Sequence, residues 1–295
     1  MQKVAAIDVG SNAVRLLIRE IGETPSFFVS DDEGKDGVLL REPIRLGADT
    51  YGSMHRIGPE KEEALLQTLL NFRQKMYQEG VSSYRACATA SLRDAENGEI
   101  VARRVSQHSG IQLEVITSEE ESALVRKSYF ARPCTERGVL LFADVGGGST
   151  DVSLTVDGDV VYVHSFRLGS LNKENAALRA EEFEAVKAEL GTLREQYGPI
   201  CMVGSGGGIH KICKKLAADP SDDHLSTTAL LELYRRLEPL SVEERMAQFQ
   251  LKRDRAEVVA ETLSIFYVLA CSVRAKTIHA PRIGVRDGII ASLVS

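Results

Sequence analysis

The chain has few cysteines and no apolar run long enough to cross a bilayer. Its five cysteines are scattered, none forms a CxxC pair, and their odd number offers no disulfide framework. The N-terminus runs directly into a strand-like segment without a cationic leader, and the richest late apolar stretch, LSIFYVLACSV, is too short to span a membrane. We therefore expect a cytoplasmic protein that does not enter a membrane.

An excess of positive charge is also missing. The net charge is −6, so broad attraction to nucleic acid or to an anionic membrane is not expected, and any anionic ligand must be bound locally. With 295 residues, of which 43% are hydrophobic and 26% charged, the chain is long enough for one or two compact domains.

The pattern along the chain alternates strands and helices. Apolar residues at helical spacing before Gly80 predict an amphipathic helix, and Asp157-Gly158 predicts a tight hairpin turn. The expected strands are 3–8, 13–20, 82–89, 111–117, 138–144, 149–156, 159–169 and 199–204, and the expected helices are 60–80, 91–110, 118–130 (capped by Ser118) and about 173–197, before a mostly helical remainder.

Two segments of the chain resemble one another. Aligning Asp8 with Asp144 matches IDVGSNAVRLLI to ADVGGGSTDVSL: an apolar strand, an aspartate, a glycine loop and a second apolar strand. Two similar domains facing each other across a cleft would bring both loops to one ligand. The simpler alternative is a pair of ordinary hairpins, which do not require an aspartate at the end of a buried strand.

Each of these aspartates needs a partner, because an isolated ionised carboxylate at the end of an apolar strand is costly. If Asp8 and Asp144 meet, a hard divalent cation such as Mg²⁺ is the simplest solution. Alternatively, each caps its own turn. Glycine loops expose backbone N–H groups to a phosphate, and Arg15 and Arg93 could add charge and forked hydrogen bonds.

Six ordered motifs carry a family resemblance: AAIDVGSNAVRLLI, ATASLRDAEN, VITSEEESALV, FADVGGGSTDVSL, RLGSLN and VGSGGGIHKI. Together they resemble the exopolyphosphatase and guanosine pentaphosphate phosphatase family, a branch of the actin, Hsp70 and sugar kinase superfamily. The resemblance implies an α/β protein of two actin-like, ribonuclease H-like domains with the active site in the cleft between them. We expect domain I to cover 1–122 and domain II 123–295, with the option that the last helix packs back on domain I.

The resemblance also implies hydrolysis of a terminal phosphoanhydride. By motif position in SEEES, Glu121 corresponds to the catalytic base, which orients and deprotonates a water, and Glu120 to its neighbour. Without the surrounding motifs, Glu119 to Glu121 would be interpreted as a solvated acidic first turn of a helix.

The chain departs from the family pattern in three places. Asp151 stands where the family usually has glutamate, so a metal or water contact there is expected to be longer or bridged by solvent. Glu261-Thr262 replaces a common Pro-Gly, which puts the local shape of the second domain in question. The chain also resembles the short two-domain form of the family. Longer members carry extra helical domains that help to hold a long polyphosphate, so processive hydrolysis by this chain is left open.

The third glycine turn, VGSGGGIHK, corresponds to a turn that packs against adenosine in nucleotide-binding members of the superfamily. In this chain the turn has two alternative roles. It binds a ligand, which is further phosphate, a guanosine nucleotide or ADP, or it serves only in packing. His210 and His279 have no partner at metal-ligand spacing, and we interpret both as ordinary.

The candidate residues lie in these motifs. They are Glu121, Asp144 and Asp8 for catalysis; Gly10, Ser11, Asn12, Arg15, Arg93, Gly146, Gly147, Gly148, Ser149 and Thr150 for phosphate; Ser205, Gly206, Gly207 and Gly208 for phosphate or nucleotide; and Asp8, Asp144 and Asp151 for Mg²⁺.

The leading hypothesis is a Mg²⁺-dependent exopolyphosphatase that releases orthophosphate from inorganic polyphosphate, expected to be a homodimer. A guanosine pentaphosphate 5′-phosphohydrolase is the closest alternative, and the residues do not separate the two. An ATP-dependent small-molecule kinase and a nonenzymatic nucleotide or polyphosphate sensor are the further alternatives.

Overall fold

The computed structural model describes residues 2–22, 37–132, 138–171, 176–206, 208–216 and 223–294. They form two compact units: unit 1 comprises Met1–Thr135 with Ile283–Ser295, and unit 2 comprises Glu136–Arg282. The boundary expected after residue 122 falls inside helix α5 (Ser118–Phe130), which is continuous. That helix stays with unit 1 because Leu124 and Val125 pack into the core of unit 1.

Unit 1 is built on a mixed sheet. Its described strands follow the order β3-β2-β1-β4-β5, in which β1, β2 and β3 form an antiparallel meander and β4 and β5 continue parallel to β1. The strands are β1 (Gln2–Val9), β2 (Val14–Ile21), β3 (Gly37–Glu42), β4 (Val81–Ala88) and β5 (Leu113–Val115).

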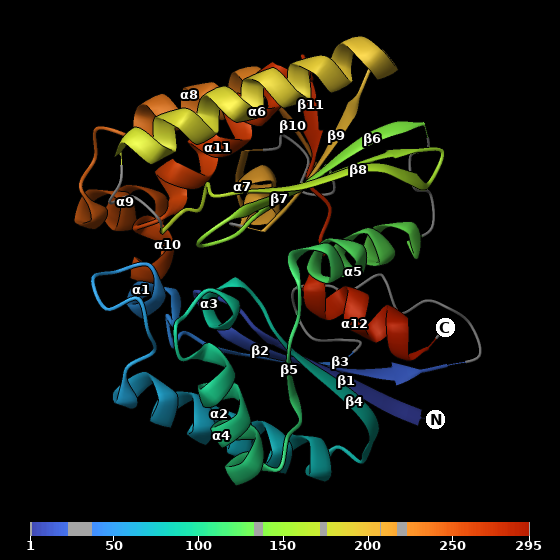
Figure 1. Ribbon diagram of the computed structural model, residues 1–295, viewed down its shortest axis with the longest axis vertical. Helices are drawn as coiled ribbons and strands as arrows, with labels where there is room; N and C mark the ends of the chain where they lie inside the picture. Colours follow the sequence, from blue (N-terminus) through green and yellow to red (C-terminus); the bar gives the residue numbers. More distant parts are fainter. Residues whose placement is uncertain are drawn as a thin grey trace. The chain divides into compact units, whose positions relative to one another are not determined.

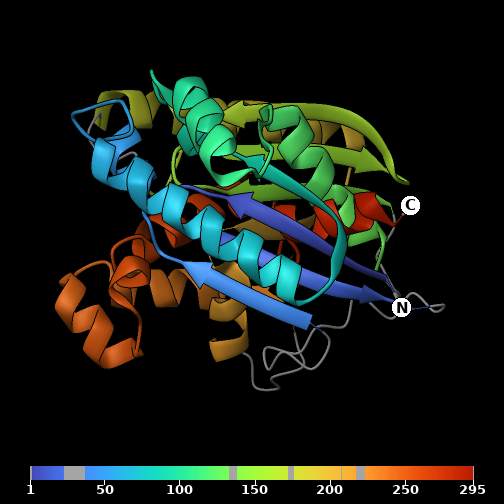
Figure 2. The ribbon, with the colours of Figure 1, turned by 90° about the horizontal axis from the view of Figure 1, so that it is seen from below.

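Helices cover both faces of this sheet. The helices α2 and α4 pack on the face formed by Ala5, Ile7 and Val9. The helix α5 and the last helix, α12, pack on the opposite face, which carries Val4 and Ala6 (Figures 1 and 2). The helices of unit 1 are α1 (Gly47–Thr50), α2 (Pro59–Gln78), α3 (Ala90–Arg93), α4 (Gly98–Ser109), α5 and α12 (Val285–Leu293).

The close packing of α12 on α5 depends on a glycine. A Cβ at Gly288 would lie 2.0 Å from the carbonyl oxygen of Leu124, so only glycine lets the two backbones approach this closely. The end of the chain thereby joins the first unit rather than the second.

The predicted helix 91–110 is broken in the structure. Residues between α3 and α4 leave the helix because the Asn97 side chain binds the backbone of Ile57, with its Oδ1 2.8 Å from the amide and its Nδ2 2.9 Å from the carbonyl. At the next predicted helix, the cap is Thr117 rather than Ser118: the Thr117 hydroxyl accepts a 3.2 Å hydrogen bond from the Glu120 amide.

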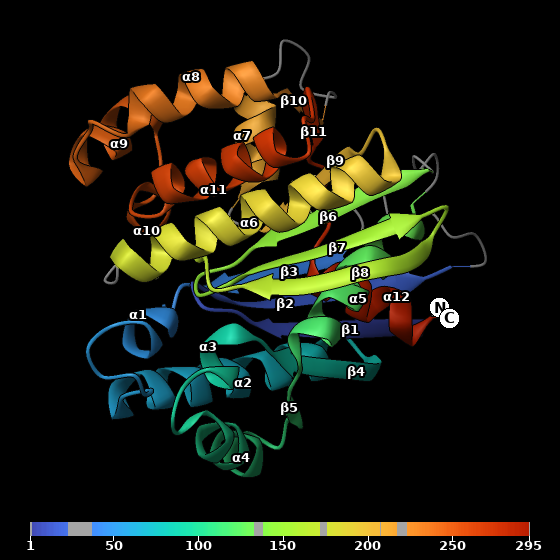
Figure 3. The same ribbon diagram turned by 45° about the horizontal axis from the view of Figure 1, so that its top comes forward.

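Unit 2 repeats the strand order of unit 1 and adds one antiparallel strand at the edge of its sheet. Its described strands follow β10-β11-β9-β6-β7-β8, so β6, β7 and β8 form the meander, and β9 and β11 continue parallel to β6 (Figure 3). The strands are β6 (Val139–Val145), β7 (Thr150–Val156), β8 (Asp159–Phe166), β9 (Cys201–Gly206), β10 (His224–Ser226) and β11 (Thr277–His279). The repeat predicted from the two aspartate motifs therefore extends to whole sheets.

One face of the unit 2 sheet carries the larger core. The segment Leu263–Val273 lies in that core, with Leu263, Phe266 and Leu269 fully buried, so core packing accounts for its apolar face. The helices of unit 2 are α6 (Ala176–Tyr197), α7 (Ile209–Leu216), α8 (Thr227–Leu237), α9 (Val242–Phe249), α10 (Arg253–Ala256) and α11 (Val259–Ser272). No helix in the described ranges is both long and apolar enough to span a membrane.

Candidate active site

The first glycine loop joins β1 to β2 in unit 1. The Gly10 amide donates a 3.2 Å hydrogen bond to the Ala13 carbonyl, which closes a tight turn. The carbonyl of Ser11 accepts a 2.8 Å hydrogen bond from the Gly47 amide, and its side chain bonds the Tyr51 hydroxyl. Burial raises the pKa of Tyr51 above its ordinary value, so this phenol stays protonated. Asn12 is half-buried in the same loop. The loop is thus anchored to α1.

Asp8 at the loop entrance has an arginine partner. Asp8 and Arg15 stand opposite one another in the β1–β2 ladder, and Arg15 Nη1 lies 3.1 Å from Asp8 Oδ2. Burial lowers the pKa of the Arg15 guanidinium, whereas the charge of Asp8 acts in the opposite direction. The compensation that the buried Asp8 requires is therefore supplied within unit 1 by a cation of the chain.

Further arginines surround this pair. Arg41 lies opposite Arg15 on β3, and Arg286 of α12 is close enough to lower the pKa of Arg15 by charge repulsion. Sequence reasoning missed both residues as site candidates, since Arg41 is brought in by strand register and Arg286 from the far end of the chain. Three guanidinium groups at one loop favour a multiply charged anion.

Glu121 and Arg93 meet at the same edge of the sheet. The parallel strands β1, β4 and β5 end together, and α3 and α5 start just after β4 and β5. Arg93 Nη1 donates to Glu121 Oε2 over 3.0 Å and to the carbonyl of Ile116 over 3.2 Å. The crevice beyond the carboxyl ends of parallel strands is the usual ligand site of open α/β sheets.

The three consecutive glutamates occupy different environments. Glu119 is exposed, and hydrogen bonds from its own amide and from Thr117 lower its pKa. Glu120 Oε1 lies 2.5 Å from Arg85, an ion pair near solvent. The Glu121 side chain is turned inward and only 12% exposed. The solvated-helix interpretation therefore describes Glu119, while Glu121 belongs to the cluster at the strand ends.

The second glycine loop, in unit 2, repeats the first turn. The Gly146 amide donates a 2.9 Å hydrogen bond to the Ser149 carbonyl, as Gly10 does to Ala13. Thr150 is fully buried and its hydroxyl donates to the carbonyl of Leu168 over 2.5 Å, so this hydroxyl is used within the loop. Gly147, Gly148 and Ser149 complete the turn, with Gly148 buried and the other two half-buried.

Residues 167–171, the described part of the RLGSLN motif, pack directly on this loop. Leu171 and Ser170 donate backbone hydrogen bonds of 2.8 and 3.0 Å to the carbonyls of Gly147 and Gly146. A Cβ on Gly169 would lie 2.1 Å from the Gly147 carbonyl oxygen, so the contact requires glycine. The loop conformation is therefore fixed by its neighbour before any ligand binds.

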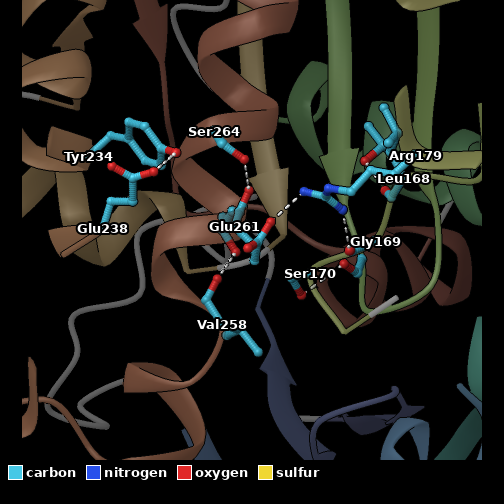
Figure 4. A network of polar contacts seen from close by, with 12 residues as sticks. Leu168, Gly169, Ser170, Arg179, Tyr234, Glu238, Val258, Glu261 and Ser264 are labelled. Carbon is cyan, nitrogen blue, oxygen red and sulfur yellow. Dashed lines mark hydrogen bonds and ion pairs between the residues drawn. The ribbon is translucent and has the colours of Figure 1, made fainter. Parts of the chain in front are cut away.

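Gly169 is itself held by an arginine that forms an ion pair (Figure 4). Arg179 donates to the Gly169 carbonyl over 3.4 Å and forms an ion pair with Glu261. The Thr262 hydroxyl donates to the Val258 carbonyl over 3.0 Å within α11. Glu261-Thr262, the departure from Pro-Gly, thus lies in the first turns of α11, where Glu261 anchors Arg179.

Asp144 is flanked by oxygen-bearing side chains. Asp151 of β7 and Ser205 of β9 stand opposite it in the two neighbouring ladders, so all three side chains share one face of the sheet. Asp151 is 5% exposed. The Ser205 hydroxyl is buried without a hydrogen-bond partner in the described part of the chain. Carboxylate and hydroxyl oxygens are the donors that Mg²⁺ prefers.

The third glycine turn touches this group. Gly206 has φ 72°, and a Cβ there would lie 2.1 Å from Asp144 Oδ1. A Cβ on Gly208, at φ 84°, would lie 2.6 Å from Arg255 Nη1, so the turn packs against a guanidinium from α10 that sequence reasoning missed. Gly207 lies outside the described residues.

The structure therefore brings the candidate residues together in two groups. Asp8, Gly10, Ser11, Asn12, Arg15, Arg93 and Glu121 belong to unit 1, and Asp144, Gly146, Gly147, Gly148, Ser149, Thr150, Asp151, Ser205, Gly206 and Gly208 belong to unit 2. Apart from the added strand β10 of unit 2, the two sheets share one strand order, and each has an aspartate and a glycine loop after its first strand. These features define an α/β protein of actin-like domains.

The chain belongs to the Ppx/GppA phosphatase family, which matches residues 38–295. It is 28% identical to Exopolyphosphatase 1 of Mycobacterium bovis over 317 aligned positions, which cover 98% of this chain and 87% of that protein. Exopolyphosphatase 1 of Mycobacterium tuberculosis H37Rv gives the same identity and coverage.

Solved structures of the family agree with this assignment. The Aquifex aeolicus family member is 25% identical, with a TM-score of 0.77 over 99% of this chain and 97% of that chain. An exopolyphosphatase from Cytophaga hutchinsonii, 19% identical, shares the fold with a TM-score of 0.82 over 99% of this chain and 98% of that chain. The predicted family, actin-like α/β fold and enzyme class, a phosphoanhydride hydrolase, are confirmed, and membership of a phosphatase family favours hydrolysis over the kinase alternative.

Proposed function

We propose that the protein is an exopolyphosphatase that hydrolyses the terminal phosphoanhydride of inorganic polyphosphate and releases orthophosphate. The observation that carries this proposal is the inward Glu121, held by Arg93 at the strand ends that also carry Asp8. The similarity to Exopolyphosphatase 1 along nearly the whole chain supports the choice of substrate.

In the proposed reaction, Glu121 accepts a proton from a water molecule as the water oxygen attacks the terminal phosphorus. The new P–O bond forms in line with the anhydride P–O bond that breaks. The bonding electrons leave with the bridging oxygen, which stays on the shortened chain. Arg93 orients the Glu121 carboxylate through their 3.0 Å contact, so the base is positioned before the substrate arrives.

Binding of the substrate is assigned to the glycine loops and the arginines. Amide groups of the two loops, and the guanidinium groups of Arg15, Arg41 and Arg286, would stabilise the charge that the phosphate oxygens carry in the transition state. The proposal requires Asp8 of unit 1 and Asp144 of unit 2 to act on the same terminal phosphate.

The proposal includes Mg²⁺ held by Asp144 and Asp151, with Asp8 as the ligand from unit 1. The Asp151 carboxylate and the Ser205 hydroxyl beside Asp144 are oxygen ligands that suit a hard cation, and two carboxylates side by side favour one. When bound, the ion would supply positive charge that stabilises the phosphate oxygens as negative charge shifts to the leaving group.

Substitution of Glu121 tests the proposed base. We expect Glu121→Gln to lower the rate of orthophosphate release from polyphosphate by about 10²- to 10⁴-fold, because the amide cannot accept the proton. Glu120→Gln is the matched control, since Glu120 is the adjacent residue and pairs with Arg85 near solvent. We expect the control to retain activity within about twofold, in keeping with a surface ion pair. Equal activity of folded Glu121→Gln and wild type would rule out Glu121 as the base.

Guanosine pentaphosphate is the second candidate substrate. The specific observation in its favour is the third glycine turn. Its backbone, which lacks Cβ atoms, lies close to the Arg255 guanidinium, and together they offer a surface on which a flat base could stack. Rates of phosphate release from short polyphosphate, long polyphosphate and guanosine pentaphosphate, each with and without Mg²⁺, decide between them. A kcat/KM highest for guanosine pentaphosphate would replace the leading proposal.

The proposal also places the enzyme in the cytoplasm as a homodimer. Light scattering of the purified chain tests the dimer, and a monomer mass at micromolar concentration would contradict it. Fractionation of producing cells tests the location.

A further inference from the structure

Two histidine rings stack at the edge of the unit 2 sheet. His224 of β10 stands opposite His279 of β11, and their ring centroids are 4.6 Å apart with an interplanar angle of 5°. Asp223 immediately precedes β10, and its Oδ1 lies 3.1 Å from His279 Nε2 and 3.4 Å from His224 Nδ1. The three side chains therefore bring one nitrogen or oxygen atom each close together.

The spacing of these atoms matches a metal site. All three ligand atoms lie within 4.8 Å of one another, and no other group of three such residues does so in the described ranges. Bonds of 2.0–2.1 Å in a tetrahedral zinc site place neighbouring ligand atoms about 3.3 Å apart. The two nitrogen–oxygen distances are close to that value, and turning one imidazole out of the stack would direct both nitrogen lone pairs at one ion.

The donor atoms of the cluster suit one divalent cation. Such a cation uses the lone pairs of both neutral imidazoles and the negative charge of Asp223. Two histidines and one carboxylate form a ligand set typical of zinc and related transition metals.

The backbone holds the ligands in place while leaving access from solvent. The Ala280 amide donates a 2.6 Å hydrogen bond to the Asp223 carbonyl, which fixes the start of β10 beside the end of β11. Side-chain exposure is 12% for His279, 24% for Asp223 and 42% for His224. Both histidines also line a pocket of about 310 Å³ at the start of β9, from which solvent could fill further coordination positions.

This cluster is separate from the proposed phosphate site. His279 is paired with Val203 of β9, whereas Ser205, two residues further along that strand, is paired with Asp144. Since β11 and β6 lie on either side of β9, two strand spacings, or about 10 Å, separate the histidine from the Asp144 strand.

We propose that Asp223, His224 and His279 bind a divalent transition-metal ion of the zinc type. The bound ion ties β10 to β11 at the edge of the sheet and so stabilises unit 2. This inference does not depend on the proposed polyphosphate hydrolysis, because none of the three residues belongs to the proposed catalytic or phosphate-binding set.

Calorimetric titration of the chelator-treated full-length protein with zinc tests this site. Excess Mg²⁺ is present to occupy oxygen-only sites. We expect one zinc equivalent per chain in wild type, and an affinity lowered by about 100-fold or more in His279→Gln, since loss of even an outer partner of a metal ligand costs about 10- to 100-fold. Zinc is also expected to raise the thermal midpoint of wild type but not that of His279→Gln.

His164→Gln is the matched control. His164 Nδ1 lies 3.5 Å from Glu189 Oε2, a similar histidine–carboxylate pair, but its other ring neighbours in the described residues are Tyr162 and Phe166. This variant is expected to bind zinc as wild type does. Because His279 is largely buried, the more exposed His224→Gln repeats the test if His279→Gln fails to fold. Absence of zinc binding by wild type at 100 µM zinc, or equal zinc affinity of wild type and both site variants, overturns the inference.

Discussion

The two aspartate loops share their backbone geometry but differ in what stands beside the aspartate. In unit 1, Asp8 has Arg15 on one neighbouring strand and Cys87 on the other. In unit 2, Asp144 has Asp151 and Ser205 at the equivalent positions. The first aspartate is paired with a cation of the chain, whereas the second has only oxygen donors at these positions.

This difference separates roles that the sequence repeat alone would make equal. Asp144 and Asp151 lie side by side on one face of the sheet and offer a divalent cation more carboxylate oxygens than Asp8 alone. We therefore propose that unit 2 supplies most of the affinity for Mg²⁺. In the same proposal, unit 1 supplies the arginines and the base, Glu121.

The largest effect is expected from Asp144→Asn. If Asp144 is the principal ligand of the cation, its loss should lower kcat/KM for polyphosphate by about 1000-fold, since a catalytic metal contributes several kcal/mol and each 1.36 kcal/mol is tenfold. The concentration of Mg²⁺ needed for half-maximal activity should rise as well. Phosphate release measured across a Mg²⁺ series checks both, and an unchanged Mg²⁺ requirement would contradict the division of roles.

A smaller effect, on the free energy of unfolding without substrate, distinguishes the two aspartate loops. In metal-free solution, Asp8→Asn should lower the free energy of unfolding by about 3 kcal/mol, because it leaves the largely buried Arg15 charge without its carboxylate. The matched Asp144→Asn relieves the repulsion between the neighbouring Asp144 and Asp151 carboxylates, so it should cost less, about 1 kcal/mol or below. Urea denaturation in the presence of a chelator measures both values. Equal destabilisation by the two variants would mean that the loops are electrostatically alike.

The parts of the fold that could be predicted are those that depend on residues close together in the sequence. An apolar run, an aspartate and a glycine loop are contiguous in sequence, so the hairpins that contain Asp8 and Asp144 could be predicted and aligned. The helix over 91–110 could not be divided correctly, because the break depends on Asn97 binding the backbone of Ile57 from a distant segment.

The site residues that were missed are non-local in the same sense. Arg41 reaches Arg15 through strand register, and Arg286 reaches it from the last helix. His279 appeared to have no metal-ligand partner because Asp223 and His224 lie far from it in sequence and reach it only through the β10–β11 pairing. The Asp144–Asp151 pair was visible in sequence as two acids near one loop, but their shared face became evident only with the register.

The smallest expected effect concerns Cys87, the other neighbour of Asp8. Burial raises the pKa of its thiol to about 12, from an ordinary value of 9.0. The unfolded chain therefore loses this proton at a lower pH than the folded chain, so stability is retained below about pH 9 and falls as pH rises toward 12. Between about pH 8 and pH 10, wild type should lose about 1.4 kcal/mol more unfolding free energy than Cys87→Ala. Urea denaturation at both pH values measures this difference, and the control removes the contribution of tyrosines and lysines, which both proteins share.

Parallel pH profiles would mean that the thiol beside Asp8 ionises as readily in the folded protein as in the unfolded chain. The Asp8 side of the comparison would then lack the low-polarity surroundings that distinguish it from the Ser205 side of Asp144.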